Sequence, residues 1–312
     1  MQLSLTACTD DSGRRLDRIL RKALRETPLS AIHRLLRQGH ILVDGKPARA
    51  DHRIRTGETI TILDGFSPVS SVKLLGEKLM LPGQVPEILY EGEGLLILNK
   101  PAGLSVHGKK SLQELVSSYL LPKLPPSLSF RPGPLHRLDR PSSGVIVFST
   151  SLEGARLFSA LMRERSIKKH YLTVVEGVIK KAEVWRDELV RNQKLKKTFA
   201  AEGEALRVTG KPALTRVTPL KENGNFTLIL AEIETGRTHQ IRAQAAGRGH
   251  ALLGDRKYGA KASGGFFLHA WRMEFPRGSF FPGLIEAPLP ENFTKMIHEL
   301  FAGDIQHCLS QL

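Results

Sequence analysis

The sequence predicts an α+β protein with a small N-terminal module and a large, mainly antiparallel domain built on a mixed sheet. Two short helical patterns followed by a strand hairpin occupy the first 64 residues. From residue 86 onward, strand patterns outnumber helical ones and do not alternate with them regularly, which argues against a doubly wound parallel sheet. The chain of 312 residues is long enough for two domains. We therefore divide it into residues 1–70, a linker at 71–85, and residues 86–312.

The N-terminal module begins with two helices, because apolar residues recur at helical spacing over 16–24 and again over 32–36, with Pro28 between them. A strand at 40–43 and another at 57–62 then form a hairpin. The remaining helical faces carry Arg14, Arg15, Arg18, Arg21, Lys22, Arg34 and Arg37. The pattern predicts a compact unit that is basic on one side.

The elements of the large domain follow from shorter patterns. The predicted strands are 88–90, 95–98, 145–148, 171–178, 226–234 and 267–275, and the first two form a hairpin. A helix that ends at Arg165 can be capped by Ser149, Thr150 or Ser151, and a second, short helix covers 238–246. Such a set favours an antiparallel sheet with few helices.

The chain carries 46 basic and 31 acidic residues, a formal net charge of +15. Residues 156–197 alone hold 12 basic and 5 acidic residues, interleaved with apolar ones. The charge predicts a polyanionic partner, although ribosomal and membrane-surface partners would require the same sign. An apolar fraction of 41% excludes disorder as the dominant state.

Several classes of protein are excluded by what the sequence lacks. Cys8 and Cys308 are the two cysteines, so neither a disulfide framework nor a cysteine-based zinc site is available. The sequence contains no secretory signal, no apolar run of membrane-spanning length, no phosphate-binding loop, no HExxH and no GxSxG. We expect a cytoplasmic protein with no membrane partner and no nucleotide or metal cofactor.

Three polar segments do not look like scaffold: Asn99–Leu104 after a strand, Leu135–Gly144 before a strand, and Glu234–Arg242 followed by Gly254–Gly259. Each has a structural explanation as well: a rigid Lys-Pro-x-Gly turn, an ion pair of Asp139 with a neighbouring arginine, and a capped helix with polar surface residues. Polar side chains held on loops by a scaffold are, however, where function concentrates.

Together these segments resemble the RluA-type pseudouridine synthases. The family patterns KPxG, HRLDxxTSG, a basic loop ending in tyrosine, and TGRTHQIR with GDxxYG occur here in that order over about residues 86–290. The segment LLRQGHILVDGKP makes the N-terminal module similar to the S4-type RNA-binding domain. This combination resembles the RluC and RluD branch of the family, which modifies large-subunit ribosomal RNA.

The resemblance implies isomerisation of uridine to pseudouridine in RNA, with base flipping and without a cofactor. Asp139 takes the position of the catalytic aspartate, Arg242 pairs with it, Tyr171 stacks on the target base, and Arg137 fills the space that the flipped uridine leaves. Further RNA contacts are expected from His136, Arg140, Lys100, Arg165, Lys168, Lys169, Arg237 and His239, and from Arg14, Arg15, Arg18, Arg34 and Arg37 of the N-terminal module. Ile241 or Leu268 should line the uracil pocket.

Several alternatives stay open at this stage. Asp139 could attack ribose carbon 1′, attack the base, or remove the ribose 2′ proton to give a glycal, the route that the family favours. Transfer RNA could be the substrate, the fold could serve a non-catalytic assembly factor, or the chain could hydrolyse nucleosides. Asn99, Ser142 and Gln244 depart from the family pattern, which bears on the subfamily. We expect a monomer.

Overall fold

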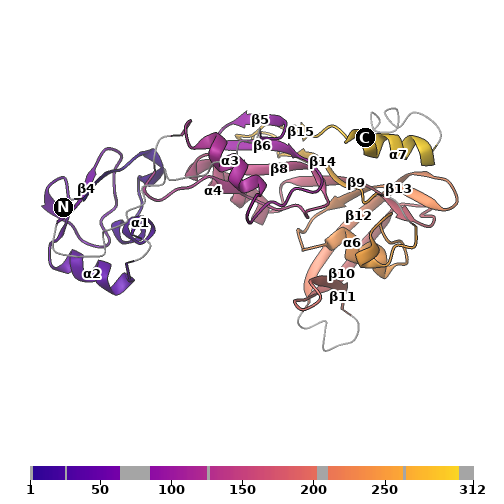
Figure 1. The fold of residues 1–312 in the computed structure, drawn as a ribbon, viewed down its shortest axis with the longest axis horizontal. Coiled ribbons are helices and arrows are strands. Elements are labelled where there is room, and N and C mark those ends of the chain that lie inside the picture. Colours follow the sequence, from indigo (N-terminus) through magenta and orange to yellow (C-terminus); the bar gives the residue numbers. More distant parts are fainter. Residues whose placement is uncertain are drawn as a thin grey trace.

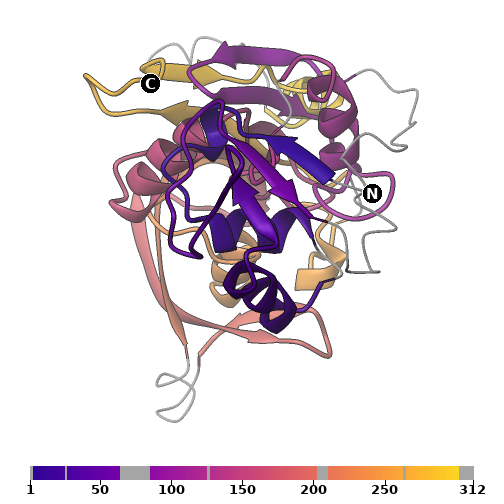
Figure 2. The ribbon, with the colours of Figure 1, turned by 90° about the vertical axis from the view of Figure 1, so that its left-hand side faces the viewer.

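The computed structural model of the protein describes residues 3–24, 27–63, 85–124, 127–201, 210–262 and 265–301. Residues 71–84 of the predicted linker and Cys308 lie outside these ranges. Figure 1 shows the N-terminal module at one end of an elongated molecule and the large sheet domain beyond it. In the view along the long axis, the module lies in front of the large domain (Figure 2).

The N-terminal module contains the two predicted helices and the hairpin. Its elements are β1 (Leu3–Thr6), the 3-10 turn η1 (Thr9–Asp11), α1 (Leu16–Ala23), α2 (Leu29–Arg37), β2 (Ile41–Val43), β3 (Lys46–Pro47) and β4 (Thr59–Ile62). The four strands form one sheet in the order β1-β4-β2-β3. The apolar helical stripes, such as Leu16, Ile19 and Ile32, are completely buried against Ile41 and Ile60 of the strands. Strand β1 was not predicted, because four residues with two leucines give too short a pattern.

The large domain is built on an eleven-stranded sheet. Its strands are β5 (Ile88–Gly92), β6 (Leu95–Lys100), β7 (Gly133–Pro134), β8 (Ser143–Ser149), β9 (Lys168–Glu176), β10 (Glu183–Asn192), β11 (Lys197–Ala200), β12 (Lys211–Glu222), β13 (Phe226–Ile233), β14 (Leu268–Glu274) and β15 (Leu284–Glu286). The main order is β11-β10-β12-β13-β9-β14-β8-β6-β5, and β15 and β7 pair with β14 and β8. Among the described pairs β14–β8 is parallel and the rest are antiparallel, which confirms the predicted mainly antiparallel, mixed sheet.

Strand β14 lies between β9 and β8, although it is nearly the last strand along the chain. Side chains of β6 and β8 alternate between two cores: Leu96 and Ile146 belong to one, and Leu95 and Val145 to the other. The middle of the sheet is therefore buried on both faces.

The helices of the large domain are α3 (Leu112–Leu120), α4 (Leu152–Arg163), α6 (Gln240–Gly247), η3 (Arg256–Tyr258) and α7 (Glu291–Leu300). Ser151 caps α4, because its hydroxyl accepts a hydrogen bond from the Gly154 amide at 3.0 Å. This helix ends at Arg163, not at the predicted Arg165, which takes a left-handed backbone with φ of 58°. Helices α3 and α7 were not predicted. No helix in the described ranges combines the length and the apolar character needed to cross a membrane.

Candidate active site

Asp139 lies in the loop that leads into β8. Leu138 turns into the core with 6% of its surface exposed, and the Ser142 amide donates to the Asp139 carbonyl at 3.1 Å. Gly144 has φ of 105°, and a Cβ there would lie 2.2 Å from the carbonyl oxygen of Ala270 on β14. A glycine is therefore required where β8 meets its parallel neighbour, and this close approach fixes the end of the Asp139 loop.

Lys100 joins this loop to the Lys-Pro-x-Gly turn. Its ammonium donates to the carbonyl oxygens of Pro101, Leu104 and Arg140 at 2.9, 2.8 and 3.3 Å, and the side chain is completely buried. Burial lowers the pKa of Lys100 to about 8, against the opposing effect of the charge of Asp139. The predicted RNA contact of Lys100 does not fit this geometry. Lys100 instead holds the backbone beneath Asp139.

The guanidinium of Arg242 lies between two carboxylates. Its Nη1 donates to Asp139 Oδ2 at 3.0 Å, while Nε and Nη2 donate to Asp255 at 2.7 and 2.8 Å. Burial alone would lower the pKa of Arg242, but the hydrogen bonds and charge of Asp255, together with Asp139, raise it overall. Arg242 is therefore a fixed cation that orients Asp139.

His239 also faces Asp139, with 3.6 Å between its Nε2 and the same Oδ2. The Tyr258 hydroxyl accepts from the Thr198 amide at 2.9 Å and makes a hydrogen bond of 2.8 Å with His239 Nδ1. The tautomer with its proton on Nε2 would direct that proton towards Asp139. Burial lowers the pKa of His239 in spite of the nearby carboxylate, which keeps the ring neutral at pH 7.

Tyr171 forms the apolar wall of the site. Its ring is 8% exposed and belongs to the same core cluster as Leu138, Ile241 and Leu268. Burial raises the pKa of its phenol, and the negative charge of Asp139 raises it further. The hydroxyl therefore stays protonated, and a flat apolar surface lies beside the carboxylate.

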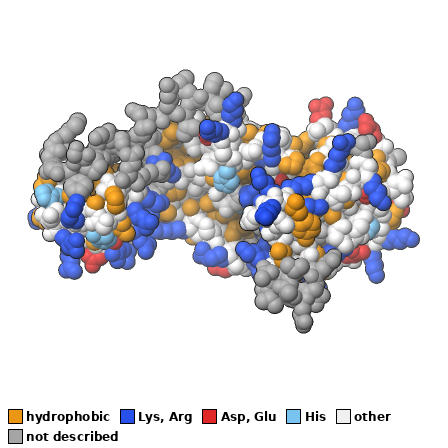
Figure 3. All heavy atoms as spheres, turned by 60° about the horizontal axis from the view of Figure 1, so that its bottom comes forward, with side chains coloured by type: hydrophobic (Ala, Val, Ile, Leu, Met, Phe, Trp, Pro, Cys, Tyr) orange, Lys and Arg blue, Asp and Glu red, His pale blue; other side chains and the backbone are white. Residues whose placement is uncertain are grey.

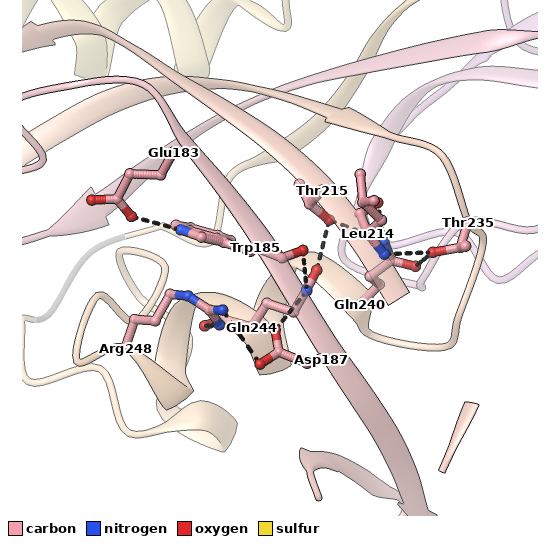
Figure 4. A network of polar contacts seen from close by, with 9 residues as sticks. All are labelled: Glu183, Trp185, Asp187, Leu214, Thr215, Thr235, Gln240, Gln244 and Arg248. Carbon is pink, nitrogen blue, oxygen red and sulfur yellow. Dashed lines mark hydrogen bonds and ion pairs between the residues drawn. The ribbon is translucent and has the colours of Figure 1, made fainter. Parts of the chain in front are cut away.

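Helix α6, which carries Arg242, is held by a buried polar network (Figure 4). Gln240 donates to Thr215 at 2.9 Å, and Thr215 donates to Gln244 at 2.6 Å. Gln244 donates in turn to Asp187, which also accepts from Arg248. The glutamine that departs from the family pattern is thus fully used in this chain, as a link between α6 and strands β10 and β12.

A group of cations lies next to Tyr171. Side chains alternate along β9, so Lys169 lies on the same side as Tyr171, and it is only 7% exposed. Burial and the like charge of Arg165 lower the pKa of Lys169. A groove of about 470 Å³ is lined by Arg165 and Arg186 together with the acidic Asp187 and Glu188, among others. Figure 3 shows Lys and Arg side chains gathered near the middle of this face of the large domain.

Of the predicted site residues, the structure brings Asp139, Arg242, Tyr171 and His239 together. Arg137 lies two residues before Asp139 and is exposed. The predicted uracil contacts Ile241 and Leu268 line the same cluster as Tyr171.

Other predicted RNA contacts have partners within the protein. Lys168 lies on the opposite side of β9, 3.5 Å from Glu274. Arg237 Nε donates to the Pro212 carbonyl at 3.0 Å, and Arg140 Nε donates to the Gly103 carbonyl at 2.9 Å.

His136 is turned inward. Its Nε2 accepts from the Val147 amide at 3.0 Å, and burial together with the charge of Lys169 lowers its pKa to about 4. It therefore supports the loop as a neutral ring.

In the N-terminal module, Arg15 binds Asp17 at 2.8 Å, whereas Arg18, Arg34 and Arg37 are exposed.

Asp255 and Tyr258 were part of a recognised motif, but the sequence assigned them no role. Their signal was the Gly-Asp-x-x-Tyr-Gly spacing itself, and the structure shows that they hold Arg242 and His239.

Comparison with known proteins agrees with this geometry. Residues 94–247 match the RNA pseudouridylate synthase family, and residues 14–60 match the S4 domain. The chain is 30% identical to ribosomal large subunit pseudouridine synthase C of Vibrio vulnificus over 93% of its length and 94% of that protein. It is 31% identical to the protein of the same name from Escherichia coli K12, with the same coverage, and 32% identical to that of Haemophilus influenzae over 87% of its length and 86% of that protein.

The fold also resembles solved structures. Human RNA pseudouridylate synthase domain containing 4 superimposes with a TM-score of 0.58 at 22% identity, over 69% of this chain and 92% of that one. Human RNA pseudouridylate synthase domain containing 1 gives the same TM-score and identity over 74% and 97%. The motif loops, the Asp139–Arg242 pair and the extent of the sequence match lead to one conclusion: this chain belongs to the RNA pseudouridylate synthase family, in a form that carries an N-terminal S4 domain.

Proposed function

We propose that this enzyme converts uridine to pseudouridine in large-subunit ribosomal RNA, with Asp139 as the catalytic carboxylate. The relatives named above are ribosomal large subunit pseudouridine synthases, and they match nearly the whole chain. The observation that carries the chemical part is the position of Asp139, which is 14% exposed between the cation of Arg242 and the ring of Tyr171. An rRNA substrate would also place the enzyme in the cytoplasm.

The carboxylate acts as a base in the route that we favour. Asp139 removes the ribose 2′ proton, the bond from carbon 1′ to nitrogen 1 breaks, and a glycal and a uracil anion remain. After the uracil turns, carbon 5 bonds to carbon 1′, the proton returns to carbon 2′, and the carbon-5 proton is lost while nitrogen 1 gains one. Arg242 orients the carboxylate before it takes the proton and after the proton returns, because Asp255 holds the guanidinium in place.

The target base has to leave its stack to reach Asp139, at a cost of about a few kcal/mol. Tyr171 offers a flat ring on which the base can stack, which contributes about 1–3 kcal/mol. Arg137 is exposed at the entrance and can occupy the vacated space. Lys169 lies beside the ring, and a phosphate there would offset the repulsion between Lys169 and Arg165.

The test is release of tritium from in vitro transcribed large-subunit rRNA labelled at uridine carbon 5. Asp139→Asn should abolish release while RNA binding, measured by filter retention, stays within about threefold. Full activity in this variant would refute the role of Asp139. A parallel reaction with labelled transfer RNA tests the substrate: faster release there would refute rRNA as the target. Free uracil among the products would indicate hydrolysis instead.

A further inference from the structure

The N-terminal module is fastened to the catalytic domain by a buried aspartate. Asp11 is completely buried, and its carboxylate accepts from the hydroxyls of Ser127 and Ser129 at 2.9 and 2.6 Å and from the Leu128 amide at 3.1 Å. These donors belong to the loop after α3, whereas Asp11 belongs to η1. Burial raises the pKa of Asp11, but these hydrogen bonds outweigh it and lower the pKa overall, so the carboxylate is charged at pH 7.

A second contact reaches the start of α4. The carboxylate of Asp10 accepts from the Leu152 amide at 2.8 Å, at the first residue of this helix. Leu128 packs against the apolar core of the N-terminal module. Polar and apolar contacts together therefore hold the module in a defined position on the catalytic domain.

This docking brings basic residues of the two domains together. Arg156 lies four residues after Leu152, on the same side of α4, and it is exposed. The pKa of Arg14 is lowered, mainly by burial and next by the positive charge of Arg156. The positive charge of Arg18 lowers the pKa of Arg14 further. Figure 3 shows Lys and Arg side chains along this junction.

The carboxylates of Asp10 and Asp11 offset only part of this positive charge, because two carboxylates stand against three arginines. Asp10 and Asp11 act on Arg14 in the opposite direction to Arg156. Their oxygens, however, receive the hydrogen bonds that dock the module, and Arg14 itself donates to the Ser129 carbonyl at 3.3 Å. An anion placed between Arg14, Arg18 and Arg156 would relieve their mutual repulsion.

We propose that Arg14, Arg18 and Arg156 form a composite phosphate-binding surface for the RNA backbone, which exists only while the module is docked. RNA is the polyanion that both domains of this family imply, so the inference rests on the proposed function for the class of partner. The S4 domain and the catalytic domain then bind one RNA segment as a rigid unit. The Asp11 contacts set the distance between the RNA-binding surfaces of the two domains.

The experiment measures equilibrium binding of in vitro transcribed large-subunit rRNA over a series of KCl concentrations. Arg156→Ala should weaken binding about three- to tenfold and reduce the magnitude of the log–log salt slope by about 1, since one phosphate contact is lost. The matched control is Lys295→Ala, which removes an exposed cation from α7 at the other end of the molecule (Figure 1). An Arg156→Ala slope equal to that of the control would overturn the proposal.

A second variant tests whether the phosphate-binding surface requires docking of the N-terminal module. Its substitutions lie in the catalytic domain, so the sequence of the module is unchanged. The Ser127→Ala/Ser129→Ala variant loses two donors to Asp11 and should show a larger radius of gyration in solution scattering. We expect this variant to lose as much of the log–log salt slope as Arg156→Ala does. Adding Arg156→Ala to it should reduce the slope no further. Independent, multiplying losses would instead show that Arg156 binds RNA without the module.

The binding and tritium-release measurements distinguish failure of the composite surface from failure of the proposed function. If the binding pattern appears but no tritium is released from this RNA, the proposed function fails and the composite surface stands. If tritium is released while Arg156→Ala binds normally, the composite surface fails and the proposed function stands.

Discussion

Asp255 offers the sharpest test of how the site is held, because it touches Arg242 and not the substrate position. Asp255→Asn keeps the size of the side chain but removes its charge and one of its two acceptors for Arg242. Breaking a buried ion pair costs about 3–5 kcal/mol, and hydrogen bonds to charged groups contribute about 1.5–3 kcal/mol. Since one hydrogen bond survives, we expect the free energy of unfolding to fall by about 2–3 kcal/mol.

The effect on activity follows from the same geometry. Arg242 loses one of its two contacts with Asp255, so its guanidinium can move and Asp139 is no longer held in one orientation. A displacement of about 1 Å at a reacting group costs about 100-fold in rate, which corresponds to about 2.7 kcal/mol. We therefore expect kcat for tritium release to fall about 100-fold, with Kd for RNA within about threefold, because Asp255 is only 2% exposed.

The control is Glu286→Gln, which breaks an exposed arginine–carboxylate pair with Arg272, between β14 and β15 and away from the site. It should lower kcat by less than threefold. If Asp255→Asn lowers the thermal midpoint but leaves kcat unchanged, Asp255 serves stability alone and the reasoning is refuted.

Three further substitutions probe the buried groups. Lys100→Met should lower the free energy of unfolding by about 2–4 kcal/mol in urea denaturation, because three buried carbonyls lose their donor; a loss below about 0.5 kcal/mol would contradict the role of Lys100 beneath the loop. Tyr171→Leu keeps apolar packing but removes the stacking ring, so kcat/KM should fall about 10- to 100-fold; an unchanged value would mean that the base does not stack there. His269 is held neutral between the Ser143 hydroxyl and the Ala287 carbonyl, and burial lowers its pKa to about 4. Between pH 6.5 and 4 only the unfolded state gains this proton, so the stability contribution present above pH 6.5 is lost as the pH falls, by about 2 kcal/mol between pH 7 and pH 5. His269→Gln should reduce but not abolish the slope of urea-measured stability over that range, because burial also lowers the pKa of His136 and His239; an equally steep pH dependence in the variant would argue against it.

The elements with a strong period were predictable from sequence. Helices α1 and α2 are apolar at helical spacing, strands β6 and β8 contain continuous apolar runs, and the structure confirms all four. Strands β10 to β12 were not predicted, because polar and charged residues such as Glu183 and Lys211 interrupt their patterns. Their order follows from tertiary pairing, which no local window contains.

The site shows the same division. The motifs place Asp139, Tyr171 and Arg242 together by resemblance, and the geometry agrees. What the motifs do not reveal is which lysine points inward: Lys168 and Lys169 are neighbours in sequence but lie on opposite sides of β9. Likewise, Lys100 looked like a surface cation because burial of its ammonium depends on three carbonyls brought together only by the fold.

The place of β14 in the sheet determines when activity can arise during synthesis. Asp139 precedes β8, whereas Tyr171 and Arg242 lie on β9 and after β13, and β14 joins these two halves of the sheet. Residues 268–274 must therefore leave the ribosome before the two halves of the sheet can pair. The long-range pairing of β14, which slows folding, is thus also the step that brings Asp139 and Arg242 together.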